Sequence, residues 1–433
     1  MQETVITWAT PAFFALIAIE LLWSLRVRRT VYRLDDALTS IGLGALSQVA
    51  GVFMRLLRIG VYALVFQAFA LAAWPTEAWW SLPLALVFYD FCYYWHHRWM
   101  HEIGVAWAAH VVHHSSEDYN LSTALRQTAT GPLLGWIPYV PMALAGVPPT
   151  LFAAVGLINL LYQFWIHTEL VGRLGWFDRV FASPSNHRVH HAVNDAYVDR
   201  NYGGVLILWD RLFGTFQDER SDDPPVYGTR APLRSFDPLR ANLEVYASLA
   251  ATSRAARRWI DRLQVWVRRP GWRPADGSAG TTAPFALAAR QRYAPEAGRA
   301  VRRYAVLQFA VVLAASVHVL QIHARTPVPE LLAYVAWVML SLSGIGRMLG
   351  REPGGWAIEA ARHAAVAVAL PLAGRWFATG ALPAWALALA AAAAAGCAVV
   401  AWRIGRDDLR RRAADALRAR GTDDARADAA RTA

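Results

Sequence analysis

The sequence predicts an all-α integral membrane protein with about nine transmembrane helices and a cytoplasmic, histidine-rich cap that holds two metal ions. Hydrophobic residues make up 56% of the 433 positions, and the mean hydropathy of +0.24 is high for a soluble protein of this size. Apolar stretches of bilayer length recur along the chain, and arginine clusters follow many of them. Ten of the thirteen histidines lie between His96 and His191, which indicates a metal centre.

The basic charge of the chain is carried by arginine alone. The sequence holds 43 basic and 32 acidic residues, a net charge of +11, and no lysine. The arginines are spread over the polar connections instead of forming one stripe, so they indicate contact with anionic lipid and predict no nucleic-acid partner. The cysteines, Cys92 and Cys397, lie in separate apolar segments, and no disulfide framework is predicted.

The first span is predicted at residues 5–25. It has no basic segment before it and no small-residue cleavage site, so we expect it to stay uncleaved. The arginines after it, at positions 26, 28, 29 and 33, predict an outer amino terminus and a cytoplasmic cluster. The next segment, 38–54, is predicted to be amphipathic or re-entrant, and the apolar run from Arg58 to Trp74 is predicted to cross.

Two returning segments are predicted to bring the chain back to the cytoplasmic side. Residues 79–95 return after a short outer turn, and residues 151–166 return after an outward crossing at 131–145. Four more spans are predicted at 304–322, 331–345, 356–377 and 381–400. With these nine crossings the carboxyl terminus lies inside, where the run of arginines from Arg403 to Arg412 is expected.

The predicted organisation has four parts. They are a membrane domain with the histidine boxes at 1–267, a linker rich in Pro, Gly, Ala and Arg at 268–300, a four-helix membrane region at 301–403, and a cytoplasmic tail at 404–433.

Eight histidines form three boxes with the spacing of metal ligands. The first box is His97 and His101, the second is His110, His113 and His114, and the third is His187, His190 and His191. If these segments are helical, the members of each box are predicted to share a face and to converge on a metal. Eight imidazoles with no nearby cysteine suit iron or zinc and exceed what one octahedral ion needs, so two metals are predicted.

The boxes lie just beyond predicted span ends, all on one side of the membrane. A metal transporter would place its ligands within the spans, along the transport path. The positions of the boxes therefore favour a capped site at the membrane surface, which a long alkyl chain can reach from the bilayer.

The boxes HRWMH from position 97, HVVHH from 110 and HRVHH from 187 resemble those of the fatty acid hydroxylase and sterol desaturase superfamily. Within it, the segments 107–127, 161–169, 184–191 and 201–216 are similar to the alkylglycerol monooxygenase family. The resemblance is strong over about 90–236 and includes residues that metal ligation alone does not require.

This resemblance implies a di-iron enzyme that uses O2 to hydroxylate a lipid C–H bond. The bond is expected to be at the ether-adjacent carbon of an alkylglycerol, and the hemiacetal that results falls apart to glycerol and a fatty aldehyde. The resemblance implies the metal ligands His97, His101, His110, His113, His114, His187, His190 and His191, with His167 as a ninth. Two further site residues are predicted, Glu102 beside His101, which is suited to bond a ligand imidazole or the glycerol hydroxyls, and Asn201.

The resemblance also implies the cofactors and partners. These are two iron ions, a lipid substrate, the membrane, and tetrahydrobiopterin as a candidate reductant, since animal members of the family use it; no motif marks another electron donor. Two alternatives stay open, a sterol or fatty acyl hydroxylase or desaturase and a metal-binding transport protein. The histidines at 96, 318, 323 and 363 are predicted to be interfacial or packed.

Overall fold

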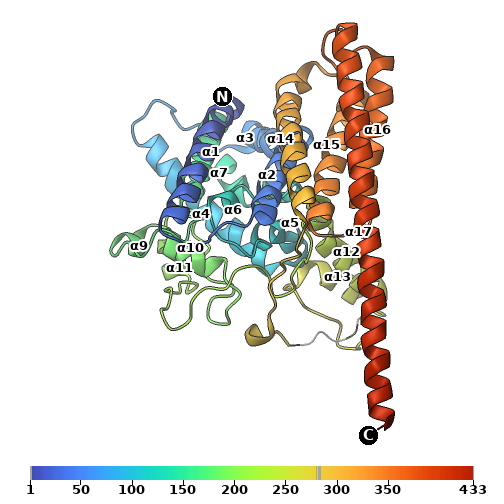
Figure 1. Cartoon of the computed structure of the whole chain (residues 1–433). Helices are drawn as coiled ribbons and strands as arrows, with labels where there is room; N and C mark the ends of the chain where they lie inside the picture. Colours follow the sequence, from blue (N-terminus) through green and yellow to red (C-terminus); the bar gives the residue numbers. More distant parts are fainter. Residues whose placement is uncertain (1, 279, 281–283, 433) are drawn as a thin grey trace. The chain divides into compact units, whose positions relative to one another are not determined.

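The computed structural model describes the backbone of residues 2–278, 280 and 284–432, and their side chains apart from 2–9, 55, 56, 58 and 411–432. The described chain is helical, without a strand, and forms two compact units, 1–294 and 295–433 (Figure 1). The boundary between the units falls inside the predicted linker. Four described helices are long and apolar enough to cross a membrane, at Leu34–Met54, Arg299–Arg325, Val328–Leu349 and Ala384–Arg410.

The first unit begins with α1 (Gln2–Arg26), which is followed by three helices that continue directly into one another. These three helices are α2 (Leu34–Arg55), the π-helix η1 (Leu56–Gly60) and α3 (Val61–Phe69). The sequence predicts an amphipathic or re-entrant segment at 38–54, whereas the structure has there one of the four helices of membrane-spanning length. The predicted crossing after Arg58 is correspondingly shorter, because its helix ends at Phe69.

The outward crossing predicted at 131–145 is not a single helix in the structure. That stretch contains η2 (Gly131–Leu133), η3 (Ile137–Tyr139) and α7 (Val140–Leu144). Each of these short helices has a proline in its first turn, at positions 132, 138 and 141. Proline lacks an N–H and clashes with the preceding turn, so three prolines within ten residues prevent a continuous helix.

Two connections meet at the end of this unit away from the histidine boxes. The loop before α4 (Ser81–Glu102) bonds to the loop before α8 (Pro149–Trp165), with Leu71 N–H donating to the Leu144 carbonyl and Trp74 N–H to that of Gly146, both at 2.9 Å. At Gly146 φ is +93°, and a Cβ there would lie 1.4 Å from the Ala72 carbonyl oxygen, so only glycine fits. The helices α4 and α8 pack together and run from this common end towards the boxes.

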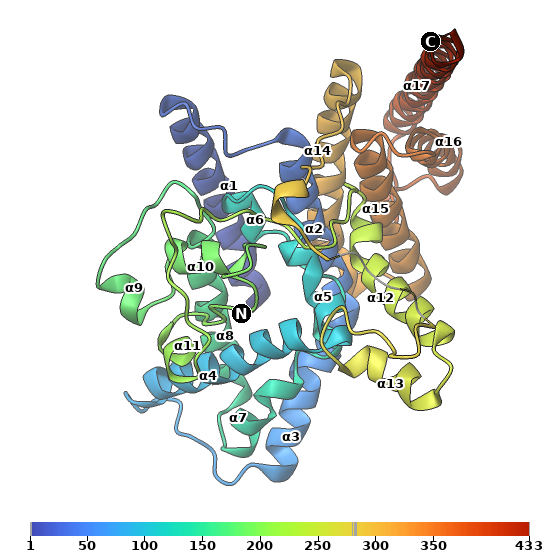
Figure 2. The same cartoon turned by 90° about the horizontal axis from the view of Figure 1, so that it is seen from below.

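The boxes lie on α4, on α5 (Gly104–His114) and on α10 (Pro184–His190), which continues into His191. Figure 2 shows these helices gathered around the centre of the unit. Short helices α6 (Leu121–Ala124), α9 (Phe177–Val180) and α11 (Leu208–Leu212) lie in the connections, and α12 (Pro238–Ala255) and α13 (Trp259–Val267) pack against α5, followed by η4 (Leu287–Ala289).

The second unit contains α14 (Arg299–Ile322), η5 (His323–Arg325), α15 (Val328–Leu349), α16 (Gly355–Ala373) and α17 (Ala384–Thr432). Helix α16, predicted as a span, is not among the four helices that meet the length and composition of one. It carries Glu359 and Arg362, both buried and paired at 2.6 Å, and the Tyr304 hydroxyl donates to the same carboxylate at 2.8 Å. The Tyr304 hydroxyl therefore ties α14 to this ion pair of α16 inside the unit.

Candidate metal centre

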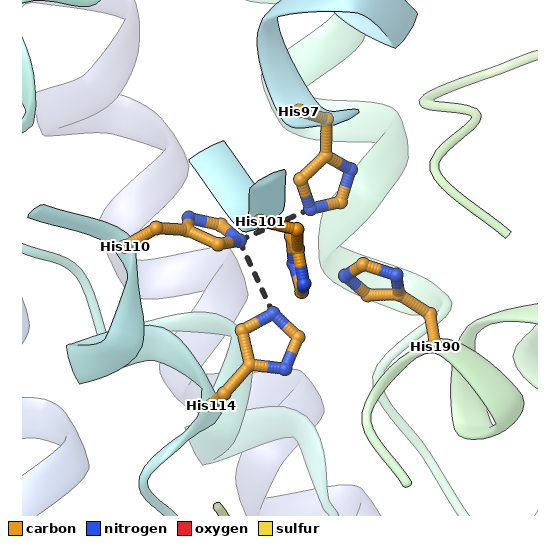
Figure 3. A group of neighbouring side chains, drawn as sticks. All are labelled: His97, His101, His110, His114 and His190. Atoms are coloured by element: carbon orange, nitrogen blue, oxygen red, sulfur yellow. Dashed lines mark hydrogen bonds between the residues drawn. The ribbon is translucent and has the colours of Figure 1, made fainter. Parts of the chain in front are cut away.

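Nine histidines, the eight of the three boxes and His167, come together in two adjacent groups. Site A consists of His97, His101, His110, His114 and His190 (Figure 3). Site B consists of His113, His167, His187 and His191. Within each group, one ring nitrogen of every histidine lies within 4.8 Å of one ring nitrogen of all the others. The groups touch, since the rings of His114 and His191 stack with their centroids 4.3 Å apart.

Each of the second and third boxes divides between the two sites. His110 and His114 face site A whereas His113 faces site B, and the third box likewise sends His190 to site A and its other two histidines to site B. The prediction that each box shares one face is therefore wrong for the second and third boxes, whereas it holds for the first, whose two histidines both face site A. In an α-helix residues i and i+4 differ in direction by about 40°, whereas adjacent residues differ by about 100°, so His113 and His114 point into neighbouring sites.

Four of the imidazoles are oriented by backbone carbonyls. The Nδ1–H groups of His97, His113, His167 and His190 donate to the carbonyls of Tyr202, Arg126, Gln163 and Arg200 at 2.8, 3.1, 2.7 and 2.9 Å. A neutral imidazole carries only one proton, so with Nδ1 as the donor Nε2 presents a bare lone pair to the site. This outer bond is the usual support of a metal-ligating histidine.

The distances between Nε2 atoms indicate that the sites bind metal cations. In site B, the Nε2 atoms of His113 and His167 lie 3.3 Å apart, and neither has a proton to share if both rings donate through Nδ1. Two lone pairs at this distance repel unless a cation lies between them. With a metal–nitrogen distance of about 2.0–2.1 Å, ligands at 90–109° are roughly 2.9–3.4 Å apart, and the Nε2 pairs of both sites fall at 3.1–3.3 Å.

Burial keeps these imidazoles neutral, which is the form that binds a metal. It lowers the pKa of His113 to about 4, and it lowers the pKa of His114, His187, His190 and His191 well below the ordinary value. The neighbouring histidines lower the pKa of these four further, because two positive rings cannot lie side by side in a buried site.

The donor set fits a transition metal with nitrogen preference. Nine imidazoles and no thiolate suit iron, zinc or a similar borderline ion in each site. In site A, the Nε2 atoms of His101 and His190 are buried, and no described residue offers either of them a hydrogen bond. Such nitrogens are costly to bury unless an ion binds them.

The two other predicted site residues lie beside the histidines without facing them. Glu102 accepts from Arg98 at 3.2 Å and from Arg269 at 3.1 Å. The side chain of Asn201 links α10 to the segment after α11, because its amide donates to the carbonyls of Asn186 and Gln217 at 3.0 and 2.8 Å. Asn201 has φ of +57°, so it forms part of a left-handed turn.

The segment after α10, which includes the short helix α11, contains site residues that the histidine pattern does not predict. Asp210 is fully buried and accepts from the N–H groups of Tyr202 and Gly203, both at 2.7 Å. This arrangement presents the Tyr202 carbonyl to His97. The Tyr202 ring lies 5.3 Å from that of His101, centroid to centroid, and no described residue bonds its buried hydroxyl. Asp199 lies 3.7 Å from Nδ1 of His101. Tyr202 and Asp210 lie in the segment 201–216 that resembles the alkylglycerol monooxygenase family, and the sequence carries no signal for what either side chain contacts.

Tyr202→Phe is expected to keep both metals and to lower turnover, by about tenfold. The hydroxyl is buried, its ring lies beside site A, and no described residue bonds it, so we expect it to bond a group that enters with substrate or oxidant. Iron per chain and the rate of lipid oxidation measure the two effects. Tyr197→Phe serves as the control, since its hydroxyl bonds the Asp223 carbonyl at 2.6 Å. An unchanged rate in Tyr202→Phe would rule out this role.

Comparison with known proteins places this geometry in context. The family model described as fatty acid hydroxylase matches residues 82–215. The alkylglycerol monooxygenase of Homo sapiens is 38% identical over 349 residues, which cover 80% of this chain and 78% of that protein. The alkylglycerol monooxygenase of Xenopus tropicalis is 34% identical over 82% of this chain and 79% of that protein.

A more distant relative acts on a different lipid class. A Delta(7)-sterol 5(6)-desaturase of Aspergillus fumigatus is 28% identical over 147 residues, 33% of this chain and 41% of that protein. No solved structure matches the chain.

Proposed function

The chain belongs to the alkylglycerol monooxygenase family, and on that premise we propose that it cleaves alkylglycerols or closely related ether lipids. Family membership makes it a lipid-hydroxylating monooxygenase that carries the histidine clusters of an iron-dependent hydroxylase. The proposed reaction inserts one oxygen atom of O2 into the C–H bond beside the ether oxygen. The hemiacetal then breaks to glycerol and a fatty aldehyde, and an external donor supplies the two electrons that, with two protons, reduce the second oxygen atom to water.

We assign one iron ion to site A and one to site B, with all nine histidines as ligands. The observation that carries this assignment is the pair of facing Nε2 lone pairs of His113 and His167. When bound, the iron supplies the electrons that let O2 attack an unactivated C–H bond, which no side chain does alone. The carbonyl-bonded rings keep their ligand tautomer, and the buried surroundings exclude water from the reacting atoms.

Glu102 and Asn201 are proposed to act through the loops that they hold. Glu102 pairs with Arg98 on its own helix and with Arg269 beyond α13. Asn201 fixes the turn that precedes Tyr202, the residue whose carbonyl orients His97. Asn201 thereby positions the first box relative to the third, and Glu102 fixes the end of the first box to the segment after α13. We propose the glycerol hydroxyls as further partners of the Glu102 carboxylate, since it is partly exposed.

The assay of this function uses iron-loaded protein, a reductant and a long-chain alkylglycerol. We expect about two irons per chain, O2 consumption, and fatty aldehyde detected by mass spectrometry. The alkyl chain is expected to enter from the bilayer between α4 and α8, near Phe88 and Phe164, so long-chain ethers should react faster than short water-soluble ones. Equal rates for both would argue against entry from lipid. Tetrahydrobiopterin is the first reductant to compare with others, because the animal enzymes suggest it.

The proposed topology is multi-pass, with about nine passages of the chain, an outer amino terminus, and both metal sites at the cytoplasmic face. The positions of the arginine clusters support it. A reporter fused after Arg412 is expected to be cytoplasmic. A signal from the opposite side of the membrane would require an even number of crossings and would overturn this topology.

The second candidate is a sterol or fatty acyl hydroxylase or desaturase, and the similarity to a sterol desaturase favours it as the alternative. The same assay separates the two. Ether cleavage releases a fatty aldehyde, whereas desaturation leaves the carbon skeleton intact and lowers the product mass by two hydrogens.

A further inference from the structure

Helix α13 presents an apolar stripe away from the protein. Trp259, Leu263 and Val267 are spaced four residues apart and are 71%, 56% and 61% exposed. The opposite face of the helix is packed, because Val265 is buried against Ala108 of α5 and Leu249 of α12. The helix therefore has two apolar faces. One packs against α5 and α12, and the other, formed by Trp259, Leu263 and Val267, has no partner in the described chain.

Arginines surround this stripe. An open hollow of about 600 Å³ lies at the corner between α12 and α13, and its lining is Arg257, Arg258, Trp259, Ile260 and Arg262. Arg268 and Arg269 follow directly after the helix, and both are exposed. Some of this charge is compensated, since Arg258 lies 3.9 Å from Asp261 and Arg269 pairs with Glu102. Exposed indole and aliphatic side chains beside guanidinium groups are typical of helices that lie in a membrane interface.

The end of α13 is fixed to the point where α4 turns into α5. The N–H of Gly104, the first residue of α5, donates to the Arg268 carbonyl at 2.9 Å, and Arg269 bonds the last residue of α4, Glu102, at 3.1 Å. In Figure 2, α12 and α13 lie together beside α5 at the edge of the first unit. In the proposed topology α4 ends at the cytoplasmic surface, so α13 lies at the level of the lipid headgroups.

We propose that the α12–α13 corner is a binding surface for anionic phospholipid of the cytoplasmic leaflet. The headgroup phosphate binds the arginines of the hollow, and the stripe of Trp259, Leu263 and Val267 inserts at the boundary between headgroups and acyl chains. Because α13 packs on α5, lipid bound there fixes the second histidine box at a constant depth relative to the bilayer. The proposal rests on the cytoplasmic topology and is independent of which lipid the enzyme oxidises.

The test uses the purified full-length protein in detergent, with phosphatidylglycerol or phosphatidylcholine of the same acyl chains, and native mass spectrometry. The wild type is expected to retain phosphatidylglycerol in preference. The variant R257Q/R258Q/R262Q is expected to lower retention of phosphatidylglycerol by about tenfold or more and to leave phosphatidylcholine nearly unchanged. The variant W259Q/L263Q/V267Q is expected to lower retention of both lipids equally.

The matched control is R220Q/R230Q/R240Q, which removes the same charge from exposed positions outside the corner. It is expected to retain phosphatidylglycerol within about twofold of the wild type, and bound iron and thermal stability check that all variants are folded. The proposal is overturned if the control loses as much lipid as the corner variant, or if the corner variant keeps its preference. A change of oligomeric mass with unchanged lipid retention would assign the surface to a second copy instead. The reporter fused after Arg412 tests the topology in a separate experiment. Failure of the proposed topology can therefore be distinguished from failure of the proposed lipid-binding surface.

Discussion

His101→Ala and His190→Ala are each expected to lose metal from site A and to lose more than about 100-fold of the lipid-oxidising activity. Changes to groups that merely support a ligand cost about 10 to 100-fold, and removal of a ligand should cost more. The structure gives both residues the same character, a buried Nε2 that no described residue bonds. Iron per chain and fatty aldehyde formation measure the two losses in parallel.

A matched control comes from the second unit. His318 on α14 bonds the Tyr334 hydroxyl through Nδ1 at 3.0 Å and belongs to neither metal group. His318→Ala should therefore keep both irons and most of the activity. If the two site A variants kept full metal content and activity, the assignment of the boxes as the catalytic centre would fail. The variant His113→Ala extends the test to site B. Loss of this imidazole should lower the iron content of site B and leave the iron in site A bound.

Arg126→Met is expected to cost about 3–5 kcal/mol of stability, as breaking one partner of a buried ion pair does. Arg126 is 1% exposed, and its guanidinium donates to Asp36 at 3.4 Å and to Ser40 at 3.1 Å. The same side chain donates to the Ser115 hydroxyl at 3.0 Å, which joins α2 to the end of the second box. Methionine fills the volume but leaves the Asp36 carboxylate buried without its cation. Thermal unfolding in detergent measures the loss.

A double variant separates charge from packing. Arg126→Met combined with Asp36→Asn removes both charges, so it should recover part of the stability that the single variant loses. The exposed pair of Arg220 and Asp222 provides the control, and Arg220→Met should leave the melting temperature nearly unchanged. A double variant that is less stable than Arg126→Met would show that the pair does not act through its charge.

The family resemblance alone predicted His167. The histidine spacing predicted that the eight box residues meet, because imidazoles at i, i+3 and i+4 are specific for ligation and rare by chance. It did not predict how they divide. Whether His113 joins His110 or His167 depends on how α5, the end of α8 and α10 pack together, which the spacing within one segment does not encode. Glu102 shows the same limit, because the Arg269 that pairs with it is distant in sequence and joins it only through the fold.

The helical spans were predicted less well than the histidine groups. Hydropathy measures whether a stretch is apolar, and it scored 131–145 as a crossing although three prolines interrupt the helix there. Hydropathy also predicts a span at 356–377. In the structure α16 is not among the four helices of membrane-spanning length and composition, and it carries an ion pair that is buried against neighbouring helices. Tyr202 lies in a loop and Asp210 on the short helix α11, and no periodicity encodes the loop conformation that brings them together, so their positions depended on the structure.

The division of the boxes between two sites also determines when metal is captured during biogenesis. His97 and His190 of site A are 93 positions apart in sequence, and site B likewise needs residues from α5, from the end of α8 and from α10. No emerging segment of the nascent chain contains a complete site. If each site binds an ion as proposed, the ion can bind only after α4, α5, α8 and α10 have folded together, and it then closes a long loop and stabilises the assembled unit.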